Sequence, residues 1–188
     1  MKVTIFGKGN MGQAIGANFE KAGNDVNYLT SEDTATSLSE LVILAVPYPA
    51  LDTIAQQYKQ ELKGKVVVDI TNPLNFETWN ELVVPADSSA AEELQNKLPD
   101  SIVLKAFNTN FAATLQSGTV GGNTTTVLVA GNEEGKKLFN DALNDSDLNV
   151  LDAGQLNRAR ELEATGFLQM TLAASEQIGW TGGFSVTK

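Results

Sequence analysis

The first two dozen residues constrain the fold more than any other stretch of this chain. Residues 2–6 are mostly β-branched or aromatic and predict a short strand, and residues 10–21 carry apolar side chains at helical spacing. Between them lies the string Gly7-Lys8-Gly9-Asn10-Met11-Gly12. The pattern therefore predicts a strand, a tight glycine turn and a helix.

A turn of this kind suits the binding of an anion. The first N–H groups of a helix have no partner within the helix, and the helix dipole adds about half a positive charge there. We expect Gly7 to allow the sharp turn, Gly9 to let a pyrophosphate approach the backbone, and Gly12 to let the helix pack closely on the strand. The alternative is a glycine turn in an α/β protein that binds no nucleotide.

Composition excludes several classes of function. The 188-residue chain has no cysteine and no histidine, so disulfides, thiolate catalysis, zinc catalysis and a Ser-His-Asp triad are all excluded, and we predict no metal site. A formal net charge of −10 disfavours nucleic acid and anionic membranes as partners. The sequence shows neither a leader-like basic and apolar start nor about 18 uninterrupted apolar residues, so we expect a cytoplasmic protein.

Further strands and helices alternate along the chain. Strands are predicted at 25–29, 41–46, 66–70 and 102–106, with helices at 50–62 and 90–98, and the polar link 30–40 leaves room for a stunted helix at most. Strands separated by helices form right-handed crossovers and a parallel sheet. We predict an α/β fold, a Rossmann-type doubly wound parallel sheet with a small C-terminal α/β extension.

The glycine-rich joint at 118–123 is the best candidate for a boundary. It divides the chain into a dinucleotide-binding domain, 1–120, and a small C-terminal α/β part, 121–188. In that part we expect a strand at 124–130, a helix at 133–143, a short strand at 149–151, one long helix at 156–177 and a last strand at 184–186. Residues 75–89 have no clear period and are expected to form a loop.

In doubly wound sheets, ligands bind outside the carboxyl ends of the strands, which makes the loops there the candidate site. Asn72 and Asn108 are suited to hydrogen-bond a ribose or a carboxamide, but asparagine after a strand is equally often a turn residue. Tyr48 either stacks on a cofactor ring or is a half-buried aromatic at a strand end. For Trp79 and Trp180, packing is the favoured interpretation. No loop offers a general acid or base with obvious geometry, so the catalytic residue is unknown.

Several longer strings resemble one known family. They are residues 6–12, 45–48, 68–74, 103–109 and 151–163, and together they are far more specific than the glycine turn. In these strings the chain is similar to the deazaflavin-dependent NADP oxidoreductases and to the cytosolic reductase domain of membrane ferric reductases.

The resemblance implies that NADP lies across the strand ends and that hydride passes to a small-molecule redox acceptor, a flavin, a deazaflavin or a quinone-like ring. It implies that the acceptor meets the nicotinamide near Asn72 and Gly154. The apolar stripe of the predicted helix 156–177 either packs on the sheet of its own chain or pairs with a second copy, and the resemblance favours a homodimer. A non-catalytic dinucleotide-binding redox sensor is the alternative function. The predicted cofactor-binding residues are Gly7, Lys8, Gly9, Asn10, Met11, Gly12, Thr30, Ser31, Val46, Pro47, Tyr48, Asn72, Pro73, Ala106, Phe107, Asn108 and Thr109.

The end of the second strand departs from the family. There the family has Ser or Thr followed by Arg, and the basic group pairs with the 2′-phosphate of NADP, whereas this chain has Thr30-Ser31-Glu32-Asp33. A carboxylate ~6 Å from the phosphate would cost roughly 3 kcal/mol per unit of phosphate charge at an effective dielectric of ~20, which would favour NAD. We hypothesise NADP, held by Lys8, Thr30 and Ser31 with both acidic side chains turned to solvent, and NAD is the alternative.

Overall fold

A seven-stranded sheet forms the centre of the computed structural model, which describes residues 1–187. Its strand order is β2-β1-β3-β4-β5-β8-β9, and every neighbouring pair is parallel except β5 and β8. This order confirms the predicted Rossmann-type α/β fold. The strands are β1 Lys2–Phe6, β2 Asp25–Leu29, β3 Leu41–Leu44, β4 Val66–Asp69, β5 Ile102–Ala106, β8 Thr126–Gly131 and β9 Asn149–Gly154, and β6 Thr119–Val120 pairs with β7 Asn123–Thr124 in a separate hairpin.

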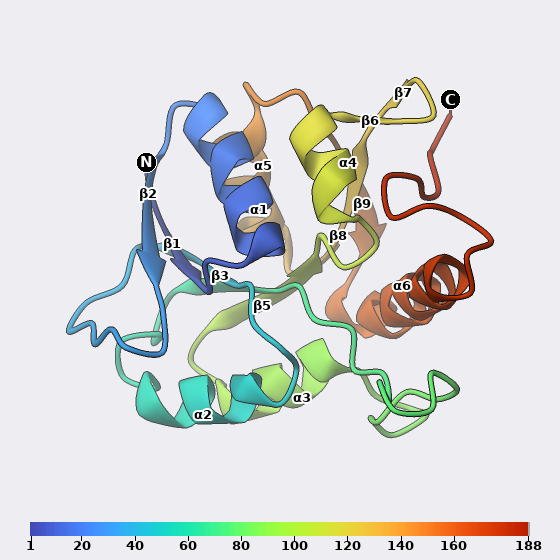
Figure 1. Ribbon diagram of the computed structural model, residues 1–188. Coiled ribbons are helices and arrows are strands. Elements are labelled where there is room, and N and C mark those ends of the chain that lie inside the picture. The colour runs from blue at the N-terminus through green and yellow to red at the C-terminus, as the bar shows by residue number, and fades with distance from the viewer. Residues whose placement is uncertain (188) are drawn as a thin grey trace.

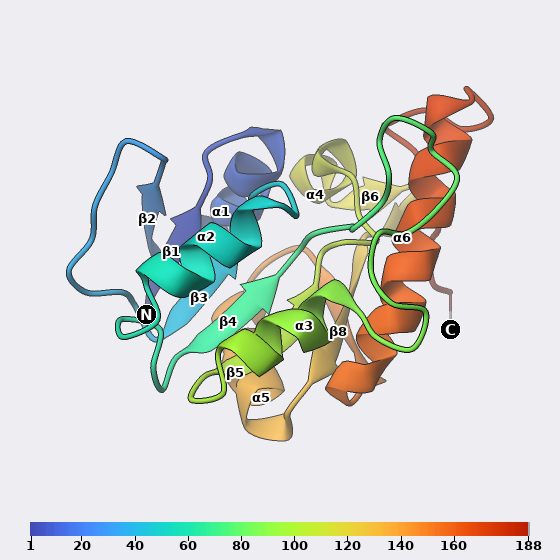
Figure 2. The ribbon, with the colours of Figure 1, turned by 90° about the horizontal axis from the view of Figure 1, so that it is seen from below.

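Helices cover both faces of the sheet (Figure 1). One layer holds α1, α4 and α5, the other holds α2 and α3, and α6 runs beside α3 at the edge of the sheet (Figures 1 and 2). Within residues 1–187, no helix is both long enough and apolar enough to cross a bilayer. The helices are α1 Asn10–Lys21, α2 Ala50–Gln57, α3 Ala90–Lys97, α4 Ala112–Ser117, α5 Glu133–Leu143 and α6 Ala159–Ala174, preceded by the 3-10 turn η1 Leu156–Arg158.

Several elements differ from the sequence-based expectation. Helix α4 was not predicted, because its six residues are too short to show a helical period. No strand forms at 184–186, and α2 ends at Gln57 rather than at residue 62. The link 30–40 contains no helix. Strands β8 and β9 continue the same sheet beyond residue 120, and the division of the chain at that residue stays a prediction about folding units.

The strand order reverses between β1 and β3, which are hydrogen-bonded neighbours in the sheet. In sheets of this kind the loops that leave the two strands diverge and open a crevice at their carboxyl ends. Both strands are buried, with Ile5 and Ile43 inaccessible to solvent in the core cluster beneath α1. The fold thus fixes the position of a ligand site at the ends of β1 and β3.

A buried ionic cluster ties β4, β5 and α6 together. The Nζ of Lys105 donates to the Oδ2 of Asp69 at 2.7 Å, to the Oε1 of Glu163 at 2.8 Å and to the backbone carbonyl of Thr71. All three charged side chains are completely buried. Burial of charges is tolerated only when they are paired and hydrogen-bonded, and here every Nζ proton has an acceptor.

Glu163 also links the ionic cluster to α3. Its carboxylate accepts hydrogen bonds from the backbone amides of Ala90 at 3.0 Å and Ala91 at 3.4 Å, in the first turn of that helix. Burial raises the pKa of Glu163 above its ordinary value, against the attraction of Lys105, and the nearby Asp69 raises it further. The side chain therefore binds its proton more tightly in the folded protein than in the unfolded chain.

This raised pKa predicts a loss of stability with rising pH. Above the pKa of glutamate in the unfolded chain, about 4.3, the unfolded state releases the proton of Glu163 while the folded state keeps it. The free energy of unfolding should then fall until the pH passes the folded pKa, by at most about 1.4 kcal/mol per pH unit. Glu163→Gln should remove this component, as measured by urea unfolding at a series of pH values.

Glu161→Gln is the matched control, because Glu161 lies on the same helix but is exposed. Its profile should stay close to that of the unmodified protein. Parallel profiles for the unmodified protein and Glu163→Gln would contradict the assignment.

Candidate functional site

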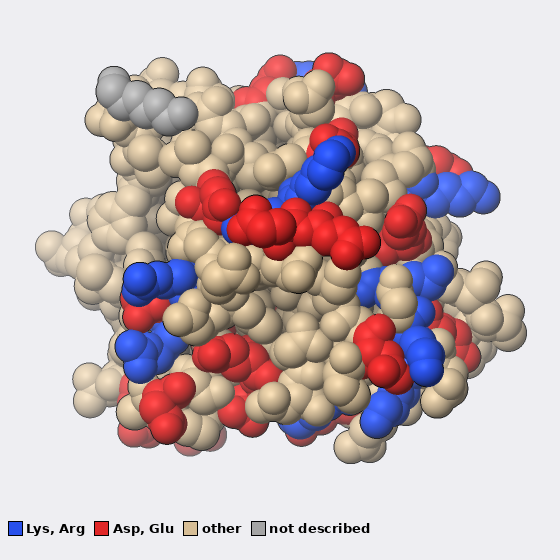
Figure 3. Space-filling model, turned by 180° about the vertical axis from the view of Figure 1, so that it is seen from behind, with Lys and Arg blue, Asp and Glu red and all other residues tan. Residues whose placement is uncertain are grey.

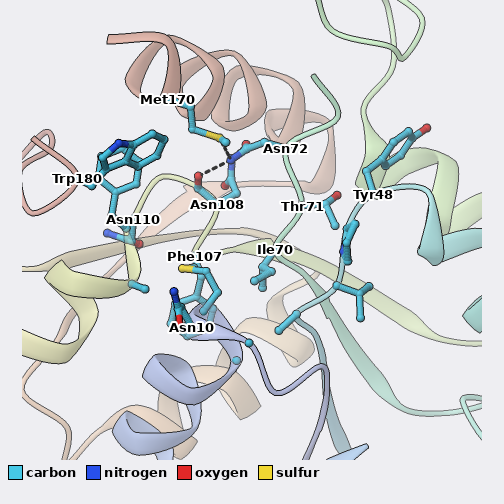
Figure 4. Close-up of a pocket in the computed structure, with 18 of the residues that line it drawn as sticks. Asn10, Tyr48, Ile70, Thr71, Asn72, Phe107, Asn108, Asn110, Met170 and Trp180 are labelled. Carbon is cyan, nitrogen blue, oxygen red and sulfur yellow. Dashed lines mark hydrogen bonds between the residues drawn. The ribbon is translucent and has the colours of Figure 1, made fainter. Parts of the chain in front are cut away.

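A cavity of about 840 Å³ opens at the carboxyl ends of the central strands. Its walls come from the loops that follow β1, β3, β4 and β5, from the start of α4, from α6 and from the C-terminal segment (Figure 4). The lining residues are Gly9, Asn10, Met11, Gly12, Ala45, Val46, Pro47, Tyr48, Ile70, Thr71, Asn72, Phe76, Phe107, Asn108, Asn110, Phe111, Ala112, Ala113, Gln116, Met170 and Trp180.

The three glycines of the turn have different structural roles. Gly7 has φ +95°, and a Cβ there would lie 2.1 Å from the carbonyl oxygen of Ala45. A Cβ on Gly12 would lie 2.2 Å from the carbonyl oxygen of Gly7. The fold itself therefore requires glycine at both positions. A Cβ on Gly9 would meet nothing within 4 Å, so the fold does not require glycine there, and the open space lies beside the cavity.

The N-terminus of α1 has no capping side chain. Its N-cap is Gly9, and its first turn contains no acidic residue. By contrast, Ser89 caps α3 and Asn132 caps α5 through side-chain oxygens, and each of those helices has two glutamates in its first turn. The free amides and the helix dipole at α1 thus face the cavity without an internal acceptor, which is the arrangement that binds a diphosphate.

The ends of β4 and β5 are joined by a pair of asparagines. Phe107 has the unusual φ of +62° for a non-glycine residue, and the turn that it forms places Asn108 beside Asn72. The Nδ2 of Asn72 donates to the carbonyl of Asn108 at 2.8 Å, and the Nδ2 of Asn108 donates to the Oδ1 of Asn72 at 2.9 Å. Both side chains line the cavity, but their amide groups are largely committed to one another.

Helix α6 and the C-terminal segment form the far wall. The Sδ of Met170 accepts from the Nδ2 of Asn72 at 3.3 Å, and the Nε2 of Gln169 donates to the carbonyl of Thr109 at 3.1 Å. Trp180 packs on Phe111 with ring centroids 5.0 Å apart. We expected Trp180 to be a packing residue, and it does pack, but it also lines the cavity.

No charged side chain lines the cavity among the residues that the structure describes. Among the lining residues described, the titratable group is the phenol of Tyr48, and burial raises its pKa, so it stays protonated at neutral pH. The same part of the chain holds no cluster of three or more acidic residues placed to bind a metal ion. The cavity can therefore hold flat, uncharged groups but offers no ionised acid or base.

Lys8, Thr30 and Asp33 lie together outside the cavity, at the end of β2. The Nζ of Lys8 is 5.4 Å from the ring centroid of Tyr28. The Oδ2 of Asp33 accepts hydrogen bonds from the hydroxyl and the amide of Thr30, both at 2.7 Å, and these bonds, with the charge of Lys8, lower the pKa of Asp33. Asp33 is exposed as we supposed, but its carboxylate occupies the donors of Thr30 instead of pointing away from them.

The predicted site residues separate into three groups. The structure brings Gly9, Asn10, Met11, Gly12, Val46, Pro47, Tyr48, Asn72, Phe107 and Asn108 together around the cavity. Seven predicted residues lie outside the lining. Thr30 and Ser31 follow β2, and the other five lie in or next to loops that line the cavity, namely Gly7, Lys8, Pro73, Ala106 and Thr109. Gly154, at the end of β9, also lies outside the lining, and its role toward a substrate stays a prediction.

The sequence-based prediction missed the residues that form the far wall. Asn110 and Phe111 precede a helix too short to recognise, whereas Met170 and Trp180 are distant in sequence from the strand ends. A signal was present only for Asn110, which lies two residues after Asn108 in the loop that follows a predicted strand.

Comparison with known proteins places this site in context. Residues 24–73 match the family model described as NADP oxidoreductase coenzyme F420-dependent. The chain is 37% identical over 147 residues to the F420-dependent NADP reductase of Methanocaldococcus jannaschii, covering 74% of this chain and 64% of that protein. It is 32% identical over 139 residues to the metalloreductase STEAP3 of Rattus norvegicus, covering 72% of this chain and 27% of that protein.

The chain thus spans less than two thirds of the length of either curated relative. Among solved structures, a candidate F420-dependent NADP-reductase from Arthrobacter sp. FB24 superimposes over 100% of both chains with a TM-score of 0.85 at 22% identity, which shows the common fold. An imine reductase from Bacillus cereus aligns over 94% of this chain and 62% of its own, with a TM-score of 0.66 at 17% identity. The sequence similarity to the curated relatives and the matched family model show that this chain resembles the F420-dependent NADP oxidoreductases over most of its length.

Proposed function

We propose that this protein is an NADP(H)-dependent oxidoreductase that passes hydride between the nicotinamide ring and an uncharged planar acceptor. The observation that carries the proposal is the uncapped N-terminus of α1, which opens beside Gly9 onto a cavity large enough for two stacked rings. Similarity to the F420-dependent NADP oxidoreductases supports NADP as the nucleotide. When bound, NADPH supplies the hydride, and the chain has to bind, orient and shield it.

The lining of the cavity supports a mechanism in which the cofactor supplies the hydride and the chain binds, orients and shields it. Hydride transfer between two rings depends on close apposition and on exclusion of water more than on a protonating side chain. Phe76, Phe111 and Trp180 give flat apolar surfaces, and Tyr48 keeps its proton. The proton that completes reduction of the acceptor comes from solvent in this proposal, since the described lining holds no carboxylic acid, lysine or histidine, and the raised pKa of Tyr48 makes its phenol a poor proton donor.

The absence of charge also bears on the acceptor. A flavin, a deazaflavin or a quinone ring is uncharged and flat, and each matches the described lining. A deazaflavin with acidic tails would have to leave those tails outside the cavity. The rival function, a redox sensor that binds the nucleotide without turnover, has the same binding site and differs only in whether an acceptor enters.

The first test is steady oxidation of NADPH with a panel of free flavin, deazaflavin and quinone acceptors, followed by the loss of NADPH absorbance. The enzyme proposal expects turnover with at least one acceptor. Tight binding of NADPH without turnover across the panel would favour the sensor instead.

Gly9→Ala separates binding from folding in this test. The added Cβ has free space in the protein but lies where the backbone would approach the diphosphate, so NADPH affinity should fall at least about tenfold, the value of one charge-assisted hydrogen bond. The melting temperature should not change. Gly12→Ala is the contrasting variant, because its Cβ would clash with the carbonyl of Gly7 and should lower the melting temperature.

Lys8 is proposed to select NADP over NAD. It is the cation close enough to lower the pKa of Asp33 at the end of β2, where the adenosine ribose lies in folds of this type. Lys8→Ala should weaken NADP binding about tenfold and leave NAD binding nearly unchanged, as measured by titration calorimetry. Lys2→Ala removes the same charge near the opposite end of β1 and is the control. An NADP/NAD affinity ratio unaffected by Lys8→Ala would reject the role.

A homodimer and a cytoplasmic location complete the proposal. The outer side of α6 exposes Leu168, and Phe184 of the adjoining C-terminal segment is also exposed. In Figure 3 the upper left of the face, where the chain approaches its C-terminus, is largely free of charged side chains. These apolar groups are the surface through which we propose that two copies pair.

Size-exclusion chromatography with light scattering tests the dimer. The unmodified protein should have the mass of two chains, and Leu168→Asp should shift it to one chain, because a buried unpaired carboxylate is costly. Thr165→Asp adds the same charge at a partly exposed position of α6 and serves as the control. A single-chain mass for the unmodified protein at tens of micromolar would overturn this part of the proposal.

A further inference from the structure

Three buried oxygens around the cavity lack hydrogen-bond partners among the residues that the structure describes. They are the Oγ1 of Thr71, the Oδ1 of Asn108 and the Oδ1 of Asn110, on side chains that are between 4% and 8% exposed. All three residues line the cavity. Buried polar atoms in native proteins are nearly always paired, so an unpaired group at a cavity wall indicates a missing partner.

The orientation of Asn110 is fixed by the chain itself. Its Nδ2 donates to the backbone carbonyl of Thr126 at 2.9 Å. A carbonyl oxygen only accepts, so the nitrogen must face Thr126 and the two ends of the amide cannot be exchanged. The Oδ1 is left as an obligate acceptor, and Figure 4 shows it turned toward the middle of the cavity, below Trp180.

Asn108 repeats the arrangement on the neighbouring side of the cavity. Its Nδ2 donates to the carbonyl of Leu162 at 2.8 Å as well as to Asn72, and its Oδ1 has no partner. Two amide oxygens that can only accept therefore lie on turns that follow the same strand, β5. The ligand group that satisfies them must carry N–H or O–H donors.

The surroundings of Asn110 restrict the ligand further. The next residue is Phe111, whose ring packs on Trp180 at 5.0 Å, and Met170 belongs to the same wall. These groups favour a flat ring, and a wall without charged side chains favours a neutral one. An amide or imide on the edge of an aromatic ring combines a neutral plane with an N–H donor.

We propose that the Oδ1 of Asn110 accepts a hydrogen bond from an amide or imide N–H on the edge of the ring held in the cavity. Asn110 is then a specificity-determining residue that orients this ring. The inference rests on the proposed function and deepens it. Two ligands offer the same chemistry, namely the carboxamide of the nicotinamide and the imide of a flavin or deazaflavin, whereas a quinone has no such donor.

Paired ligands that differ only in the donor test the proposal. The first pair is NADPH, whose nicotinamide ring is neutral, and the reduced form of its 3-acetylpyridine analogue, in which a methyl group replaces the amide NH₂. The second pair is lumiflavin and 3-methyllumiflavin, measured with NADP⁺ present, in which methylation removes the imide N–H. Dissociation constants are measured by quenching of tryptophan fluorescence or by calorimetry, so the readout does not depend on turnover.

The unmodified protein should prefer the donor-bearing member of one pair by about tenfold, and Asn110→Ala should bind both members of that pair equally. Because each ratio is taken within one protein, a general loss of affinity cancels. Asn123→Ala is the control, since Asn123 is exposed and its side chain donates to the Oγ of Ser185, away from the cavity lining. If Asn110→Ala does not fold, Asn110→Ser retains a hydroxyl donor for the carbonyl of Thr126.

Each outcome has a defined meaning. Collapse of the nicotinamide ratio assigns Asn110 to the carboxamide, and collapse of the flavin ratio assigns it to the acceptor. Unchanged ratios in an Asn110 variant that still binds NADPH would overturn the inference and leave the proposed function standing. If the unmodified protein binds none of these ligands, both the inference and the proposed function are rejected.

Discussion

The structure depends on one buried ammonium group. The Nζ of Lys105 joins β5 to β4 through Asp69, to the loop after β4 through the carbonyl of Thr71, and to α6 through Glu163. An unpaired charge in such a place costs several kcal/mol, and removal of one member of a buried pair typically destabilises a protein by roughly 3–5 kcal/mol. The cluster is therefore a constraint on where β4, β5 and α6 can lie.

That constraint determines the shape of the site. Asn72 follows Thr71, and Asn108 lies three residues beyond Lys105, so the ionic cluster sets the positions of both asparagines. Glu163 holds α6 against the first turn of α3, and Gly166, one turn further, lets α6 approach so closely that a Cβ would lie 2.4 Å from the Oδ1 of Asn72. The charged side chains of this cluster are buried outside the lining, and the cavity itself is lined by neutral groups.

Local patterns sufficed for the first half of the molecule. The glycine turn, the strands β1 to β5 and the loops at their ends were predictable because β-branched runs, glycines and helical periods are short-range signals. The far wall of the cavity was not, since Met170 and Trp180 reach it only through the packing of α6 and the C-terminal segment. The buried cluster was equally out of reach, because nothing in the neighbourhood of Lys105 in sequence indicates that Glu163 will lie 2.8 Å from it.

The end of β2 shows how local chemistry bears on cofactor choice. The segment between β2 and β3 forms no helix that could engage the amide and hydroxyl of Thr30. The carboxylate of Asp33 accepts a hydrogen bond from each of them instead. A 2′-phosphate that approaches Thr30 has to displace this carboxylate, whereas the hydroxyl of NAD would not. Selection of NADP therefore requires that the attraction of Lys8 outweigh both the lost bonds of Asp33 and its repulsion. Because Asp33 is exposed, its displaced carboxylate is hydrated by water, and this keeps the cost of exchanging one anion for another small.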